Sequence, residues 1–266
     1  MTYQEFIQRV HLITGLDLES YKERQMERRI RQLLQRKQID FKSFCEELIC
    51  NEAAKDDFLK YLTINTSGFF RDEHIYAYLA DKVIKDLLRE HDRINIWSAG
   101  CSTGEEPYTL SMVLHEQGAG RYSKILATDI DSGVLEKAGK GCYQPRQLEK
   151  MAPGLKKKYF EYIDGSYYFR DRYKQIVNFR QLNLLKEFSK HVGPLQLILC
   201  RNVFIYFKTE VQEKLISSFS GLLPAGGYLV TGCTEMINQP RQFGLERKIP
   251  AVYRKMPATL ASPSLS

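Results

Sequence analysis

The sequence lacks any apolar run of the roughly 18–20 residues that a membrane-spanning helix needs. Its first residues, MTYQEFIQRV, also lack the basic and then apolar layout of a secretory signal peptide. The six cysteines are scattered, with no CxxC pair and no spacing typical of a metal site. These absences predict a cytoplasmic protein with reduced thiols, no metal and no direct insertion into a membrane.

The composition is that of an ordinary globular protein, with 43% hydrophobic and 27% charged residues in a chain of 266. The formal net charge of +7 favours an acidic partner. A nucleic acid, an anionic membrane and an acidic protein surface all fit that charge, and composition does not choose among them.

Glycine is absent between Gly15 and Gly68, and helix-forming residues dominate residues 1–90, which predicts an N-terminal helical domain. The helix expected over Tyr21–Gln38 sorts its side chains by chemistry, with a strongly basic stretch at 21–37. At 100° per residue, four apolar side chains share one face: Met26, Ile30, Leu33 and Leu34. Three arginines share a face roughly opposite: Arg24, Arg28 and Arg31. This basic face is either merely solvated or a docking surface for an acidic helix or for phosphates.

Residues 91–256 show a different pattern, because strands and helices alternate from about Asp92 onward. This alternation is typical of an α/β fold with a doubly wound, Rossmann-like parallel sheet. The last strand, Ala251–Lys255, is expected to close the sheet in antiparallel orientation, and residues 257–266 are expected to be a disordered tail. The first four expected elements are Ile94–Ser98, Pro107–Gln117, Ser123–Asp129 and Ser132–Lys140.

A segment at about 143–178 interrupts this alternation and is rich in tyrosine and basic residues. Ser166–Asp171 and Gln175–Arg180 are predicted to be short strands joined by a turn. The segment is therefore predicted to be a small inserted antiparallel β-subdomain, which either packs only or binds a peptide.

The stretch Ile94–Tyr108, INIWSAGCSTGEEPY, has the parts of a nucleotide-binding crevice: an apolar strand, a turn of small residues and the start of a helix. The turn reads G-x-x-x-G, which departs from a dinucleotide fingerprint. Glu105 and Glu106 stand where a pyrophosphate would need a bare helix N-terminus. Two carboxylates there repel phosphate but suit a ligand with a cationic group.

Other polar residues follow the expected strands at their carboxyl ends, where ligands of such sheets bind. Asp129 is placed to hold the hydroxyls of a ribose, whereas Asp131 better fits the cap of the next helix. Asn183-Leu184 and Arg201-Asn202 follow two later strands. A carboxylate for the ribose and carboxylates for a cationic amino-acid end favour S-adenosylmethionine over a nicotinamide dinucleotide.

These residues lie within motifs that resemble those of the chemotaxis receptor methyltransferase family, the CheR type. The similarity extends to about residue 256, and generic methyltransferases lack the first and last motifs. The motifs are NTSGFFR at Asn65–Arg71, WSAGCSTGEEPY at Trp97–Tyr108, ATDID at Ala127–Asp131, NLL at Asn183–Leu185 and CRNVFIYF at Cys200–Phe207.

The resemblance implies an enzyme that transfers a methyl group from S-adenosylmethionine to glutamate side chains on the cytoplasmic helices of chemoreceptors, giving S-adenosylhomocysteine. It implies that Arg71 and Tyr206 act at the transferring methyl group. It implies a further set that binds the cofactor: Asn65, Ser67, Arg71, Glu105, Glu106, Asp129, Asn183, Leu184, Arg201 and Asn202.

The resemblance also implies partners. The basic helix, through Arg24, Arg28 and Arg31, would dock on the receptor's helical bundle, and the β-subdomain would hold a C-terminal receptor peptide. The chain would act as a monomer recruited to membrane-bound receptor arrays, with no nucleic acid.

The chemistry agrees with a glutamate acceptor, whose pKa of about 4.3 leaves it ionised at neutral pH without a general base. None of the five histidines falls in an expected site turn. Two alternatives remain open. One is an RNA methyltransferase, although no NPPY-like loop follows Leu195–Cys200. The other is an inactive module that senses S-adenosylmethionine. The presence of Arg71, Asp129, Asn202 and Tyr206 argues against this second alternative.

Overall fold

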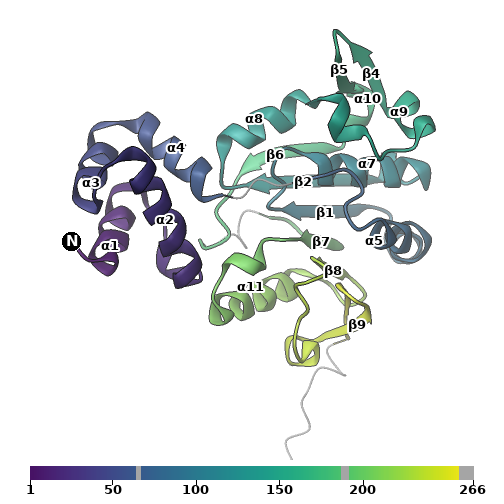
Figure 1. Ribbon diagram of the computed structural model, residues 1–266. Coiled ribbons are helices and arrows are strands. Elements are labelled where there is room, and N and C mark those ends of the chain that lie inside the picture. The colour runs from purple at the N-terminus through teal and green to yellow at the C-terminus, as the bar shows by residue number, and fades with distance from the viewer. Residues whose placement is uncertain (64–66, 187–191, 258–266) are drawn as a thin grey trace, which may run out of the picture. The chain divides into compact units, whose positions relative to one another are not determined.

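The structure is a computed structural model that describes residues 1–63, 67–186 and 192–257 (Figure 1). The chain divides into two compact units. The helical unit comprises Met1–Asn65 and Ile205–Glu213, and the sheet unit comprises Thr66–Phe204 and Lys214–Ser266. The expected tail lies almost wholly outside the described residues. No helix in the described ranges has both the length and the apolar character to cross a membrane.

The N-terminal part of the helical unit packs its α-helices around a core of apolar side chains. Helix α1 starts at a capping box, in which Thr2 and Glu5 each bind the other's backbone N–H. In α2 the predicted apolar face is confirmed, because Met26, Ile30 and Leu34 are buried. The helices are α1 (Tyr3–Thr14), α2 (Glu23–Lys37), α3 (Phe41–Cys50) and α4 (Glu52–Leu62).

The chain returns to the helical unit a second time, through Ile205–Glu213. Tyr21 pairs with Phe207 in an isolated β-bridge, and their rings lie 5.0 Å apart between centroids. The backbone N–H of Lys22 donates to the carbonyl of Tyr206 at 2.9 Å. The sequence did not indicate this return.

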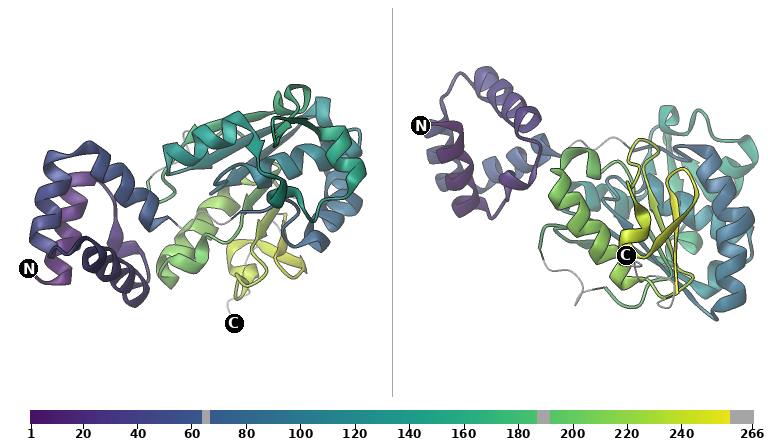
Figure 2. Two further views of the ribbon diagram at one scale, coloured as in Figure 1. Left: turned by 45° about the horizontal axis from the view of Figure 1, so that its top comes forward. Right: turned by 90° about the horizontal axis from the view of Figure 1, so that it is seen from below.

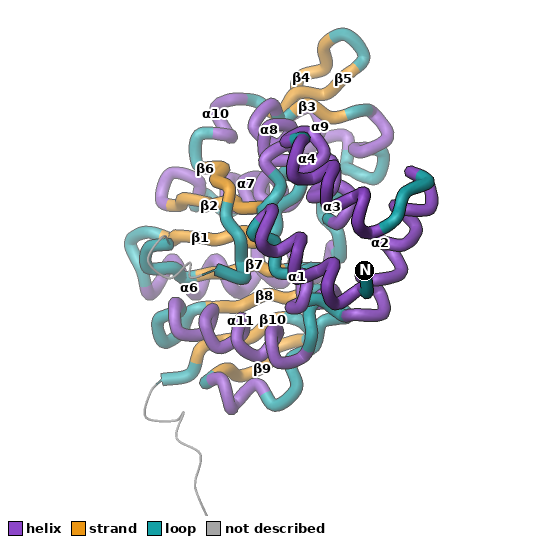
Figure 3. Tube along the Cα trace, turned by 90° about the vertical axis from the view of Figure 1, so that its left-hand side faces the viewer, coloured by secondary structure: helices purple, strands orange, loops and turns teal. Residues whose placement is uncertain are grey.

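The sheet unit is built on a seven-stranded sheet in the order β6-β2-β1-β7-β8-β10-β9, which Figure 3 shows from one edge to the other. The first five strands of this order are parallel, and β10 runs antiparallel to both of its neighbours, β8 and β9, as expected for the last strand. The α/β fold class is therefore confirmed. The strands are β1 (Ile94–Ala99), β2 (Ser123–Asp129), β6 (Val177–Gln181), β7 (Leu197–Cys200), β8 (Tyr228–Thr231), β9 (Leu245–Ile249) and β10 (Val252–Lys255).

Helices cover both faces of this sheet (Figure 2). Alternate side chains of β1 point to opposite faces. Ile96 joins a core with Ile75 and Leu110, whereas the ring of Trp97 packs edge-on against Phe219 at 5.3 Å between centroids. The helices are α5 (Glu73–Tyr78), which continues through a π-helical turn (Leu79–Val83) into α6 (Ile84–Glu90), α7 (Glu105–Glu116), α8 (Ser132–Lys140) and α11 (Thr209–Leu222).

Residues 66–90 belong to the sheet unit, although the sequence placed them in the helical domain. Their apolar side chains, among them Ile75 and Leu79, are fully buried in the same core as β1 and β8. Helical character alone could not reveal this, because a helix that covers a sheet has the same periodicity as one in a bundle.

The inserted β-subdomain is confirmed as a small antiparallel sheet, in the order β3-β5-β4, but its strands differ from those predicted. Gln175–Arg180 does not pair with Ser166–Asp171. Instead, its residues from Val177 on form β6, which lies parallel to β2 in the main sheet. The elements of this region are β3 (Cys142–Tyr143), α9 (Pro153–Tyr159), β4 (Phe160–Ile163), β5 (Ser166–Phe169) and α10 (Asp171–Lys174).

Candidate active site

The first turn after β1 needs a glycine at position 100. Gly100 adopts a φ of 82°, in the left-handed region. A Cβ atom placed there would lie 2.5 Å from Cγ2 of Val203. The missing side chain therefore lets this turn approach the segment that follows β7.

Glu106, in the first turn of α7, is held by groups of the protein itself. The hydroxyl of Ser98 donates to its Oε1 at 2.7 Å, and Nη1 of Arg201 lies 3.5 Å from its Oε2. Burial raises the pKa of Glu106, and the positive charge of Arg201 opposes that shift. Glu106 thus supplies a negative charge to the turn through a carboxylate that already has two partners.

The carboxylate of Glu105 accepts hydrogen bonds from the turn and from the inserted segment. Its Oε2 accepts from the hydroxyl of Thr103 at 2.7 Å, and its Oε1 accepts from the side chain of Gln147 at 3.1 Å. The side chain of Tyr143 donates to the carbonyl of Thr103 at 2.8 Å. Both oxygens of Glu105 are engaged, so its contacts in the structure are with the turn and with the inserted segment.

Asp129 lies at the carboxyl end of β2 and is buried. Its two oxygens accept from the backbone N–H groups of Ser102, at 2.9 Å, and of Asp131, at 3.1 Å. Burial raises its pKa above the ordinary value of 3.8, and these two hydrogen bonds oppose the shift. Asp131 caps α8, as predicted, by accepting from the N–H groups of Gly133 and Val134.

The residues around Asp129 fit a ribose. Each carboxylate oxygen accepts one hydrogen bond from the backbone and keeps capacity for another. The hydroxyl oxygen of the adjacent Ser102 is buried without a hydrogen-bond partner in the described part of the chain. A ligand with neighbouring hydroxyl groups would satisfy both the carboxylate and this hydroxyl.

Asn183 and Leu184 follow β6 and lie next to the end of β2. The N–H of Leu182 donates to the carbonyl of Asp129 at 2.9 Å, which ties the two strand ends together. The side-chain oxygen of Asn183 accepts from the N–H of Leu185 at 2.9 Å, and both predicted residues are half-buried. The structure therefore brings Asn183 and Leu184 to the same strand edge as Asp129.

Arg201 and Asn202 follow β7, between the first turn and the loop that carries Arg71. The guanidinium of Arg201 lies 2.6 Å from Oδ2 of Asp72 and donates to the carbonyl of Arg71 at 2.8 Å. Asn202 has a φ of 61°, and its N–H donates to Oε2 of Glu235 at 2.6 Å.

The NTSGFFR motif is only partly described. Asn65 lies outside the described residues, and Ser67 is half-buried. The side chain of Arg71 is exposed, although its neighbours are anchored. Phe70 donates from its N–H to the hydroxyl of Thr109 at 3.2 Å, and Phe69 packs against the ring of Tyr143.

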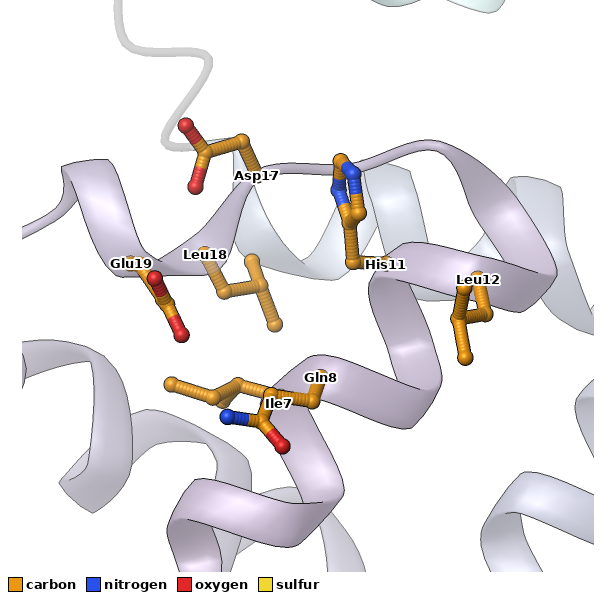
Figure 4. Close-up of a pocket in the computed structure, with 7 residues that line it drawn as sticks. All are labelled: Ile7, Gln8, His11, Leu12, Asp17, Leu18 and Glu19. Atoms are coloured by element: carbon orange, nitrogen blue, oxygen red, sulfur yellow. The ribbon is translucent and has the colours of Figure 1, made fainter.

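Tyr206 belongs to the helical unit, where its side chain is half-buried. The role implied for its hydroxyl therefore stays a prediction. The close-up in Figure 4 shows a different feature of the helical unit, a hollow of about 410 Å³ between α1 and the turn that follows it. None of the predicted site residues lines this hollow, whose walls are Ile7, Gln8, His11, Leu12, Asp17, Leu18 and Glu19.

The three arginines predicted to dock a partner lie on the exposed side of α2, but they are not equivalent. Arg31 pairs with Glu27 at 2.7 Å, which neutralises part of the basic face. Arg24 and Arg28 form no ion pair with another described residue. The guanidinium of Arg29 turns inward and donates to the carbonyl of Tyr61, and the hydroxyl of Tyr61 donates to the backbone carbonyl of Arg29 at 3.0 Å.

Sequence reasoning missed three residues that shape the site: Asp72, Tyr76 and Glu235. Glu235 holds the N–H groups of both Asn202 and Gly232 on one oxygen. The sequence could have indicated Glu235 by the same feature that indicated Asp129, because Glu235 is an acidic residue just beyond a buried strand. Asp72 directly follows the NTSGFFR motif, and Tyr76 lies one helical turn further along α5.

Two protein-family models match this chain. Residues 1–63 match the model of the CheR methyltransferase all-alpha domain, and residues 65–250 match that of its SAM-binding domain. A chemotaxis protein methyltransferase of Listeria monocytogenes is 36% identical over 245 residues, covering 91% of this chain and 93% of its own. Chemotaxis protein methyltransferase 2 of Pseudomonas aeruginosa is 35% identical, covering 88% and 85%.

Among solved structures, an O-methyltransferase family protein from Burkholderia thailandensis covers 77% of this chain and 60% of its own, with 13% identity and a TM-score of 0.44. A likeness of that degree carries no argument about activity. The family models span nearly the whole chain, and the curated relatives match at well above 30% identity. The chain therefore belongs to the CheR family of S-adenosylmethionine-dependent chemotaxis methyltransferases.

Proposed function

We propose that this enzyme methylates glutamate side chains on the cytoplasmic helices of chemoreceptors, giving glutamate methyl esters and S-adenosylhomocysteine. The observation that carries this proposal is the match to relatives named chemotaxis protein methyltransferases over both the helical and the sheet domain. Arg24 and Arg28 of α2, which form no ion pair within the described ranges, support it because they suit an acidic helical surface.

The cofactor would be held at the carboxyl edge of the parallel strands. Asp129 would accept hydrogen bonds from the ribose, and Asn183 and Leu184 would flank the adenine. Asn202 would border the amino-acid portion, and Glu106 would contribute negative charge there. Asn65 and Ser67 are also assigned to this site. When bound, S-adenosylmethionine supplies an electrophilic methyl group on a positively charged sulfur.

The residues of the chain would then orient the acceptor rather than activate it. A glutamate carboxylate is already ionised at neutral pH and needs no proton removed. The exposed guanidinium of Arg71 would orient this carboxylate, and the hydroxyl of Tyr206 would help to position it. Alignment of reacting groups and exclusion of water are sufficient sources of rate for such a transfer.

The β-subdomain is proposed to bind a C-terminal peptide of the receptor. Its β4–β5 hairpin exposes large apolar side chains, with Tyr162 59% and Tyr168 38% exposed. Strand β4 is also at an edge of its small sheet, where a peptide can add as a further strand. The enzyme would work as a monomer in the cytoplasm, at membrane-bound receptor arrays, without nucleic acid.

The test is to incubate the purified chain with methyl-labelled S-adenosylmethionine and a receptor cytoplasmic fragment. We expect base-labile label, and mass spectrometry should locate it on glutamates. A fragment whose labelled glutamates are replaced by alanine is the matched control. Label in added RNA, or cofactor binding without transfer to the receptor, would contradict the proposal.

His74 offers a separate check on the chemistry. Its Nε2 lies 3.8 Å from the sulfur of Cys233, and it follows Arg71 by three residues. The sequence indicated no histidine near the site. Because an ionised glutamate needs no base, His74→Gln should leave the pH profile of receptor methylation unchanged. A lost ionisation near neutral pH in this variant would indicate an acceptor that must be deprotonated.

A further inference from the structure

We propose that Arg201 is a positioning residue that locks the loop carrying Arg71, and that Asp72 and Tyr76 act on methyl transfer through it. This inference rests on the proposed function only for the role of Arg71. It differs from the role that the sequence predicts for Arg201, which is direct contact with the cofactor.

Both Nη atoms of the Arg201 guanidinium contact partners within the sheet unit. Nη1 lies 3.0 Å from the hydroxyl of Tyr76 and 3.5 Å from Oε2 of Glu106. Nη2 donates to Oδ2 of Asp72 and to the carbonyl of Arg71. These four contacts use four of the five N–H donors of the group. The fifth, on Nε, is buried without a hydrogen-bond partner among the described residues, and the side chain as a whole is only 2% exposed.

A guanidinium in this state has no donor left at the surface for a ligand. It is a buried cation that needs its carboxylate partners, because an uncompensated charge in the interior is strongly unfavourable. Asp72 is its nearest carboxylate, at 2.6 Å, whereas Glu106 lies at 3.5 Å and also accepts from Ser98. Asp72 is therefore the main anchor for the loop side of this network.

The loop needs such an anchor because its backbone is strained on both sides of Arg71. Phe70 has a φ of 51° and Asp72 a φ of 59°, and neither is a glycine. Non-glycine residues hold the left-handed conformation only where their surroundings fix it. The fixed points are Thr109 for the N–H of Phe70 and Arg201 for both the carbonyl of Arg71 and the side chain of Asp72.

Tyr76 completes the anchor from the following helix. Its ring is 2% exposed, and the guanidinium carbon of Arg201 lies 5.4 Å from the ring centroid. The aromatic face and the hydroxyl thus contact the same cation. The side chain of Arg71 is exposed on a loop that is held by Thr109 on one side and by Arg201 on the other. A fixed backbone is what precise orientation of an acceptor carboxylate requires.

The test uses Asp72→Asn and Tyr76→Phe, which keep the size of each side chain. Asparagine also tolerates the left-handed conformation at position 72. In both variants we expect kcat for receptor methylation to fall at least fivefold, while the Kd for S-adenosylhomocysteine stays within threefold. Amide hydrogen exchange over residues 68–76 should accelerate at least tenfold. The control is Glu90→Gln, which breaks an exposed ion pair with Arg254 in the same unit and should change none of these quantities.

A Kd that rises in step with the loss of activity, with unchanged exchange over residues 68–76, would show that Arg201 serves the cofactor instead. Unchanged kcat and unchanged exchange would also overturn the proposal. Hydrogen exchange separates this result from a failure of the proposed function. If the unmodified enzyme does not methylate receptors but Asp72→Asn still loosens the loop, the anchor stands and the assigned substrate is wrong.

Discussion

Asp129 is buried, and its carboxylate accepts hydrogen bonds from a ligand most strongly when it is ionised. Burial raises its pKa in the folded protein above the unfolded value. The folded, ligand-free protein therefore binds more protons than the unfolded chain between those two pKa values. The contribution of Asp129 to stability is accordingly complete below the unfolded pKa and is lost as pH rises through the folded pKa. Ligand binding has the opposite dependence, because the ionised carboxylate is the stronger hydrogen-bond acceptor.

We expect the Kd for S-adenosylhomocysteine, measured by calorimetry, to increase as the pH is lowered through the raised pKa of Asp129. Asp129→Asn should weaken binding roughly tenfold or more above that pKa, because it loses a hydrogen bond to a charged acceptor. Its Kd should also vary less with pH than that of the unmodified enzyme. An unchanged affinity in this variant would exclude Asp129 as the ribose ligand.

Gly100 permits a second prediction at the scale of one residue, because the chain supplies its own control. Gly118 has a similar φ of 70°, and nothing lies within 4 Å of the Cβ that an alanine would add. Gly118→Ala should therefore lower the free energy of unfolding by the backbone strain alone, about 1–2 kcal/mol. Gly100→Ala should cost roughly a further 1–3 kcal/mol from the clash with Val203.

Urea denaturation of the two variants measures this difference. Adding Val203→Ala to Gly100→Ala should recover part of the extra loss, because it removes the methyl group that the new Cβ meets. Equal losses for Gly100→Ala and Gly118→Ala would mean that the turn has room for a side chain.

Individual site residues could be predicted from the sequence where they follow a buried strand. Asp129 and Asn183 lie at the predicted strand edge for that reason. The partners of Arg201 could not be predicted, because Asp72 is 129 positions and Tyr76 125 positions away in the chain. Local patterns contain no information about which distant side chain a buried guanidinium will meet.

The element with the clearest functional prediction is α2. Reversing the charge of Arg24 and Arg28 should raise the KM for the receptor at least fivefold and should make that KM less dependent on salt concentration. The reason is that these side chains have no acidic partner in the described structure and are available to the receptor. Affinity for S-adenosylhomocysteine should not change. Reversal of Arg9 and Lys42, two exposed cations on α1 and α3, is the matched control. If both double variants raise KM equally, net charge alone attracts the receptor.

The β-subdomain shows why elements can be predicted better than their pairing. Val177–Arg180 alternates between apolar and polar residues as a strand should, but alternation does not specify the partner strand. Hydrogen bonding places its residues beside β2, where Ile125 pairs with Val177. The true hairpin had a local signal, since Asp164-Gly165 joins β4 to β5 with positive φ at both residues. Asp-Gly between alternating strands strongly indicates such a turn.

At the scale of the whole molecule, the helical unit is discontinuous in sequence. A protein of residues 1–65 alone should melt roughly 10 °C lower than one in which residues 205–213 are joined to it by a flexible linker. The reason is that Phe207, 4% exposed in the structure, covers apolar surface next to Tyr21. Thermal unfolding followed by circular dichroism measures this, and Phe207→Ala in the joined protein should abolish the gain.

The return of the chain through Ile205–Glu213 also bears on how such enzymes can diversify. A recombination event with a single breakpoint near residue 65 would replace helices α1–α4 by those of a relative. Phe207 of the original chain would then pack against whichever residue the relative has at position 21. Segments 1–65 and 205–213 are therefore expected to be inherited together. A chimaera intended to redirect the enzyme to a different receptor should exchange both segments at once.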